Sequence, residues 1–144
     1  MEKLKQLVQK LKQLQANPIS LLIKPLVNRL KPIIIDKNTS RLYDKGLRTD
    51  GVSLGTYRPF TIAYKSAKGQ KTAFVTLKDE GDFYASFEVV INETNFEIIA
   101  TDYKTDEILS KYGEQVLGLS ASDLQDLKID FVENAILILR KILF

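Results

Sequence analysis

The stretch that decides the fold is SASDLQDLKIDFVENAILILRKIL, residues 120–143. Apolar side chains recur in it at the three- and four-residue spacing of a helix face, at Leu124, Leu127, Phe131, Val132, Ala135, Ile136, Leu139 and Leu143. Ser120 and Asp123 have the spacing of a variant capping box, in which the Ser120 side chain accepts a hydrogen bond from the amide three residues on and Asp123 lies at the positive end of the helix. We therefore predict a long C-terminal helix over residues 120–143. Leu137, Ile138 and Ile142 widen its apolar face near the end, so we expect Leu137 and Ile138 to contact another protein.

Upstream of this helix, residues 57–101 are predicted to form a small antiparallel sheet. Phe60, Ile62 and Tyr64 alternate with Thr61, Ala63 and Lys65, which is the period of a half-buried strand. Further strands are expected at 73–77, in the latter half of 83–91 and at 96–101, the last two joined by a hairpin loop at 92–95. A short helix over 105–111, stopped by Gly113, leads toward the C-terminal helix.

Residues 1–31 form a basic segment that is predicted to be helical. Its first part carries one apolar stripe on an otherwise polar helix, made of Leu4, Leu7, Val8, Leu11 and Leu14. Asn17 and Pro18 are expected to start a second, buried helix, which Pro25 kinks or divides and which ends at Lys31-Pro32. Residues 33–36 fit either a strand or a helix. A short helix from Thr39 or Ser40 would close at Gly46, and 48–56 is expected to be a loop.

Together these elements predict a single α+β domain over residues 1–144, with N-terminal helices, a small antiparallel sheet and a long C-terminal helix packed on the sheet. The length suits one domain with its own core better than two. The first fifteen residues lack the apolar run of a signal peptide, and no segment is long and apolar enough to span a bilayer. We therefore expect a soluble protein made in the cytoplasm.

Composition removes many classes of enzyme. The chain contains neither cysteine nor histidine, which excludes disulfides, thiolate nucleophiles, Ser-His-Asp triads and the usual zinc sites. We expect no cofactor and no metal. The best candidates for carboxylate chemistry are Asp79 and Asp82 beside Gly81, which would make the protein a hydrolase, but a solvated acidic turn is the simpler interpretation.

Charge is divided unevenly along the chain. Residues 1–48 carry 11 basic and 3 acidic side chains, for a net charge of +8, and the other 96 residues carry a net charge of −5. Such a division suggests docking onto a charged neighbour. Three interpretations fit the first helix with its lysines Lys3, Lys5, Lys10 and Lys12: an ordinary amphipathic helix that packs one face on the domain, docking onto another subunit, or binding to a membrane surface or DNA.

Residues 49–65, TDGVSLGTYRPFTIAYK, resemble an "Asp-Gly, aromatic, Pro, Thr-Ile, Lys" segment of the phage virion-morphogenesis and tail-completion (neck) protein family. Residues 77–87, LKDEGDFYASF, are similar to the family's next segment, and Gly118-Leu119-Ser120 resembles its entry into the last helix. The resemblance departs from the family where Leu54 replaces a usual Trp and where Lys111 to Glu114 replace a Pro-rich approach to that helix. The matching positions are Asp50, Gly51, Tyr57, Pro59, Thr61, Leu77, Gly81, Phe83 and Ser86.

The resemblance implies a structural virion protein without enzymatic activity, a ring subunit at the head–tail junction of a tailed phage that is assembled in the bacterial cytoplasm. Its partners would be copies of itself, portal or connector and tail proteins, with non-specific contact to DNA in the channel and no membrane contact. Ring subunits join through head-to-tail surfaces, which we expect at the lysines of the first helix and at Arg48, Lys68, Lys71, Leu137 and Ile138. A small nucleic-acid-binding protein that uses the basic first helix is the alternative.

Overall fold

A computed structural model describes all 144 residues and shows an α+β fold of six α-helices and one two-stranded antiparallel sheet. Helix α1 (Glu2–Ala16) is followed by a π-helical turn, η1 (Ile19–Ile23), then α2 (Lys24–Ser40) and a second π-helical turn, η2 (Arg41–Lys45). After a loop come α3 (Pro59–Ala67) and α4 (Asp82–Ala85), the hairpin of β1 (Phe87–Ile91) and β2 (Phe96–Ala100), and α5 (Thr105–Tyr112). A 3-10 turn, η3 (Glu114–Val116), precedes the long C-terminal helix α6 (Ala121–Leu143).

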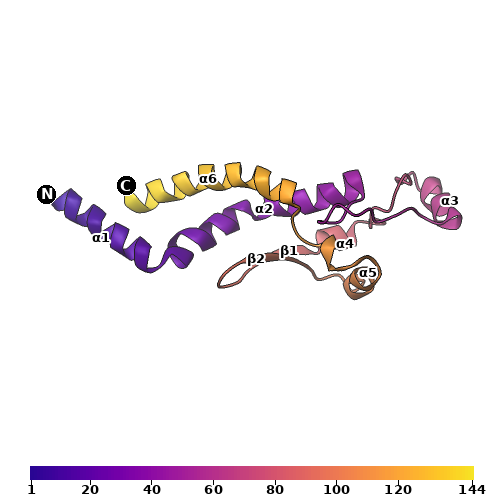
Figure 1. The fold of residues 1–144 in the computed structure, drawn as a ribbon, viewed down its shortest axis with the longest axis horizontal. Helices are drawn as coiled ribbons and strands as arrows, with labels where there is room; N and C mark the ends of the chain where they lie inside the picture. The colour runs from indigo at the N-terminus through magenta and orange to yellow at the C-terminus, as the bar shows by residue number, and fades with distance from the viewer.

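Helix α2 is the central element of an elongated molecule (Figure 1). Its main contacts are with α6 along one side and with β1 on the other, so it supplies much of the core. The buried side chains of α2 are Leu26, Val27, Leu30, Ile34 and Asn38. Phe83, Phe87, Val89, Ile98 and Leu127 meet this face from α4, the hairpin and α6. The core therefore lies where α2, the hairpin and the first half of α6 come together.

The hairpin and the capping of the last helix agree with the sequence predictions. Phe87 pairs with Ala100 and Ile91 with Phe96, around a loop at residues 92–95. Ser120 Oγ accepts a hydrogen bond from the Asp123 amide at 3.0 Å, and Asp123 Oδ2 accepts one from the Ser120 amide at 3.0 Å. This reciprocal pair satisfies two amides that a helix start otherwise leaves without partners. The helix α5 and its stop at Gly113 are also confirmed.

The main packing partner of α6 is α2 and not the sheet. Figure 1 shows α6 along one side of α2 and the hairpin on the other. The expected packing of the C-terminal helix on the sheet is corrected accordingly. The hairpin is small, and α2 packs against it through β1.

The predicted helix end at Lys31-Pro32 is wrong, because α2 continues through Pro32 to Ser40. A proline inside a helix removes one backbone hydrogen bond and costs about 3 kcal/mol. Pro32 is exposed, so water can satisfy the freed carbonyl, while Leu30 and Ile34 on either side are almost fully buried. Burial of this face outweighs the local cost, and residues 33–36 are therefore helical.

The start of the second helix is confirmed. Pro18 is its first helical residue, the Asn17 carbonyl accepts from the Leu21 amide at 3.0 Å, and the chain enters α2 through η1. The second helix was expected to be buried, and this prediction is wrong at its start, since Ile19 and Leu21 are 40% and 37% exposed. Gly46 does close the helical segment, with a left-handed φ of 62°.

The predicted strand at residues 60–64 is wrong, because these residues belong to α3. Pro59 stands at the start of this helix, where its fixed φ suits a first turn, and Arg58 before it is extended. Residues 73–77 form no strand either, so the sheet within residues 57–101 is confined to the hairpin. A strand needs a neighbour to satisfy its backbone, whereas a helix satisfies its own.

Candidate assembly surfaces

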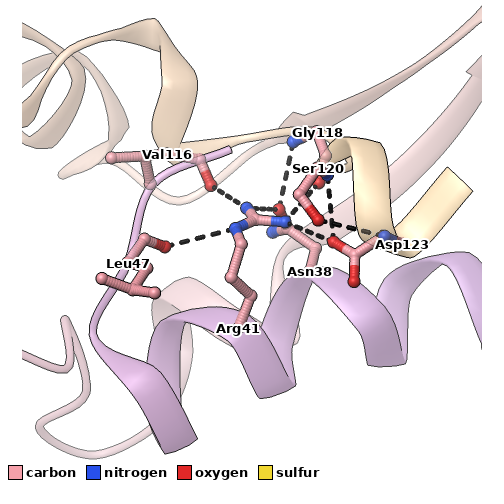
Figure 2. Close-up of polar contacts among 7 residues, drawn as sticks. All are labelled: Asn38, Arg41, Leu47, Val116, Gly118, Ser120 and Asp123. Carbon is pink, nitrogen blue, oxygen red and sulfur yellow. Dashed lines mark hydrogen bonds and ion pairs between the residues drawn. The ribbon is translucent and has the colours of Figure 1, made fainter. Parts of the chain in front are cut away.

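The most connected polar group in the molecule is Arg41, at the start of η2 (Figure 2). Its guanidinium has five N–H groups, and each has an acceptor. Nε donates to the Leu47 carbonyl at 3.2 Å, Nη1 to the Gly118 carbonyl at 2.9 Å and Nη2 to the Val116 carbonyl at 3.1 Å. The other two bonds reach Asp123 Oδ2 at 3.1 Å and Asn38 Oδ1 at 2.6 Å. Arg41 thus joins α2, the 116–118 segment and the start of α6.

Burial is the larger influence on this guanidinium and lowers the pKa of Arg41, while the hydrogen bond and charge of Asp123 act in the opposite direction. The side chain is only 5% exposed, and the Nδ2 atom of neighbouring Asn38 is buried without a partner. Sequence reasoning missed Arg41. The signal was present: the buried face of α2, continued past Pro32 from Leu30 and Ile34, reaches Asn38 and Arg41.

At the end of the molecule where both termini lie, α1 and α6 expose many of their apolar side chains. Helix α1 has no buried residue, and its stripe leaves Leu4, Val8 and Leu11 between 42% and 58% exposed. On α6 the exposed apolar residues are Leu124, Ile129, Val132, Ile136 and Leu137. We call these two sets together the helical-arm surface. Ile138, expected in a contact surface, is instead 9% exposed and turned inward, whereas Leu137 is 41% exposed.

The basic residues of α1 lie on the same arm. Lys3, Lys5 and Lys12 are exposed, Lys10 is half-buried, and none of the three ion pairs in the structure involves them. The start of α1 meets the end of α6, since Lys3, Leu7 and Lys10 line one cavity with Leu143 and Phe144. The four lysines therefore lie on one helix at the end of the molecule where both termini are found (Figure 1).

At the opposite end, α3 stands away from the helical arm (Figure 1). Phe60 is 84% exposed and Tyr64 51% exposed, and they lie four residues apart on one face of the helix. The one buried side chain is Lys65, whose Nζ donates to the Lys78 carbonyl at 2.7 Å and lies 5.0 Å from the centre of the Tyr57 ring. Helix α3 is thus fastened through Lys65 and presents aromatic rings to solvent.

The other predicted contact residues in this region already have partners within the chain. Arg48 forms an ion pair with Asp50 and donates to the Tyr112 carbonyl at 3.2 Å. Lys68 lies 3.2 Å from Asp79 Oδ1. Lys71 donates to the Tyr43 carbonyl at 3.1 Å and lies over the Tyr43 and Phe74 rings. Of these, Lys68 is the most open to solvent, with its side chain 36% exposed, and Arg48 and Lys71 are half-buried.

The residues that carry the family resemblance fall into two groups. Asp50 and Gly51 form a turn in which the Asp50 carboxylate accepts from Arg48, a bond that lowers the pKa of Asp50, and Gly51 has a φ of 79°. Pro59 and Thr61 belong to the first turns of α3. The second group lies in α4 and in the segments next to it, and consists of Tyr57, Leu77, Gly81, Phe83 and Ser86.

Two tyrosine hydroxyl groups hold this second region together. The Thr76 amide donates to Tyr57 Oη at 2.9 Å, and Tyr84 Oη donates to the Thr76 carbonyl. Thr76 is 1% exposed, so these bonds satisfy a buried backbone segment that belongs to no strand. Burial is the main reason that the pKa of Tyr84 is raised above its usual value.

At the acidic turn, the Asp79 carboxylate already has partners within the chain. Gln70 and Lys68 donate to the Asp79 carboxylate, and these bonds lower the pKa of Asp79. A general acid near neutral pH needs a raised pKa, so the shift has the opposite sign. No group of three acidic side chains could hold a metal ion, and no helix has both the length and the apolarity needed to cross a bilayer.

Comparison of the chain with protein-family models, with curated proteins and with solved structures finds no match.

Proposed function

We propose that this protein is a structural subunit of a tailed phage, a neck or tail-completion ring protein that acts at the head–tail junction through non-covalent contacts. The observation that carries the proposal is the exposed area. The chain has an accessible surface of 9504 Å², whereas a compact monomer of 16.4 kDa exposes about 7,500 Å². The excess of about 2,000 Å² is close to what a subunit buries against two neighbours at about 800 Å² each.

The nature of the excess surface supports the same proposal. The helical-arm surface exposes large apolar side chains on two helices, which is typical of a surface that a partner covers. Exposed aromatic residues on α3 add a second surface at the other end of the molecule. Two different surfaces at opposite ends suit head-to-tail contacts, which close into a ring when the rotation between copies allows it.

The test uses a tailed phage whose genome encodes this chain. A nonsense mutation in the gene should leave heads and tails that form but do not join, visible by electron microscopy, with loss of infectious particles. Purified protein added to the lysate should restore joining. Normal infectivity of particles that lack the protein would refute the proposal.

A second candidate function, non-specific nucleic-acid binding, is favoured by one observation. Lys3, Lys5 and Lys12 are exposed without acidic partners on one helix. The same helix has no aromatic side chain to stack on bases, so the binding would be electrostatic. We therefore rank it second.

A further inference from the structure

We propose that α3 of one copy inserts into the groove between the hairpin and the η1/α6 helices of the next copy, and that this contact is the head-to-tail joint. The inference deepens the proposed ring function and rests on it. It commits to a second copy of this chain as the occupant of the groove.

The groove has a volume of about 730 Å³, within the range of about 300–1,000 Å³ seen for pockets that enclose drug-sized ligands. Its floor is apolar, formed by Ile23, Val27, Ile98, Leu119 and Phe131. Ile19 and Leu124 at its walls are 40% and 46% exposed. Nothing in the isolated chain covers these side chains, so an apolar insert would remove them from water.

Helix α3 carries side chains whose chemistry suits this groove. Phe60, Tyr64 and Lys68 follow one another at four-residue spacing, and Lys68 Nζ lies 4.6 Å from the centre of the Tyr64 ring. The helix projects from the end of the molecule and cannot reach its own groove, which lies toward the middle (Figure 1). Burial of aromatic side chains in a partner's pocket is a usual source of interface energy.

Charge complementarity selects another copy of the chain as the partner. All five charged residues between positions 51 and 78 are basic, and all seven between positions 79 and 103 are acidic. The first run includes Arg58 at the start of α3, and the second includes Glu93 and Glu97 on the rim of the groove. Arg58 and Glu93 have no ion-pair partner within the chain. Opposite charges on the projecting helix and on the rim would steer copies into this register.

Charge reversal tests the joint. Arg58→Glu on the helix, or Glu93→Lys with Glu97→Lys on the rim, should each lower phage titre or self-association of the concentrated protein by at least about tenfold. The triple variant, which exchanges the signs of both surfaces, should regain most of the loss. Glu107→Lys, an exposed reversal on α5 outside the groove, is the matched control and should have little effect.

Cross-linking supplies a readout that does not depend on infectivity. The chain has no cysteine, so Ala67→Cys, at an exposed position of α3 that leaves Phe60 and Tyr64 in place, can be mixed with Thr94→Cys, each variant bearing one thiol. A short bismaleimide should join the two variants in assembled particles or in concentrated protein, and should not join Ala67→Cys to Glu107→Cys.

The outcomes separate the two proposals. Loss of infectivity on gene deletion, without rescue by the triple variant and without the cross-link, would overturn the joint and leave the ring function standing. Normal infectivity on deletion would overturn the ring function, and the cross-link would then decide the joint alone. Cross-linking of Ala67→Cys equally to Thr94→Cys and to Glu107→Cys would show non-specific association and would also overturn the joint.

Discussion

At the scale of single residues, Arg41 is the side chain on which the fold depends most. Three of its five hydrogen bonds reach residues 75 to 82 positions away in the sequence, at Val116, Gly118 and Asp123, and the side chain is almost entirely buried. Removing one partner of a buried ion pair leaves the other charge and several carbonyl groups uncompensated, at a cost of about 3–5 kcal/mol.

Arg41→Ala should therefore lower the free energy of unfolding by about 3–5 kcal/mol, measured by urea denaturation. Arg41→Lys should lose most of the same stability, because an ammonium group cannot serve five acceptors in a fixed plane. Arg48→Ala is the control: the Arg48–Asp50 pair lies at the surface, so its loss should cost far less stability than the loss of Arg41. Equal losses at positions 41 and 48 would contradict this assignment.

Tyr84 predicts a dependence of stability on alkaline pH. Burial, with a smaller influence of Tyr57, Tyr43 and Asp44, raises the pKa of Tyr84 in the folded chain. The unfolded chain then loses its proton first, at a pKa of about 10. Stability is fully present below that pH and falls as the pH rises toward the folded-state pKa.

Near neutral pH, the free energy of unfolding of Tyr84→Phe should be about 1 kcal/mol lower than that of the native chain, because the hydrogen bond to the Thr76 carbonyl is lost. Above about pH 10 its stability should decline less steeply than that of the native chain. The measurement is urea denaturation across this range, with Tyr103→Phe, which is 85% exposed in the native chain, as control. Parallel declines for all three proteins would disprove the prediction.

At the scale of elements, α6 has one side that stabilises the chain and another that is available to partners. Leu127 is 5% exposed against α2 and the hairpin core, while Ile129, two residues later, is 65% exposed. The two roles can therefore be separated by mutation.

Leu127→Ala should lower the free energy of unfolding by about 2–5 kcal/mol, as buried Leu-to-Ala changes do. Ile129→Ala should change it by no more than about 0.5 kcal/mol. If the helical-arm surface is an interface, Ile129→Ala should instead reduce restoration of head–tail joining by the purified protein. Loss of folding stability at Ile129 would show that this face is already covered within the chain.

The elements predicted correctly from sequence are those whose signals are local. The capping box at Ser120, the Gly113 stop and the 92–95 hairpin loop depend only on residues a few positions apart. The predicted helix end at Pro32 is wrong because the burial of Leu30 and Ile34 comes from tertiary packing, which a short stretch of sequence does not reveal. Alternation at Phe60, Ile62 and Tyr64 was mistaken for a strand because it arises here on an exposed helix that buries none of the three.

The candidate surfaces were predicted only in part, for the same reason. The exposure of Leu137 and of the α1 lysines follows from helical spacing, but the inward turn of Ile138 depends on where α2 lies. Similarly, the sequence alone suggests that Arg48 and Lys71 are free to contact a partner. The structure shows that Arg48 pairs with Asp50 and that Lys71 donates to the Tyr43 carbonyl.

At the scale of the whole molecule, the ring proposal and the nucleic-acid alternative differ in their response to salt. Binding to phosphates releases counterions, so affinity falls linearly on a log–log plot with a slope of about −0.9 per phosphate contact. Under the alternative, a variant carrying Lys3→Gln, Lys5→Gln and Lys12→Gln should bind DNA more weakly and with a shallower slope. If native and variant chains show no difference in fluorescence-anisotropy titrations at any salt concentration, the α1 lysines do not bind DNA.

The N-terminal end of α1 and the C-terminal end of α6 meet at one tip of the molecule (Figure 1). A short flexible linker could therefore join them into a circularly permuted chain, opened instead at the exposed Gly69 turn beside α3. Such a permutant would keep α2 and its packing intact. It would also move the site for an affinity tag or a fluorophore from one extremity of the protein to the other.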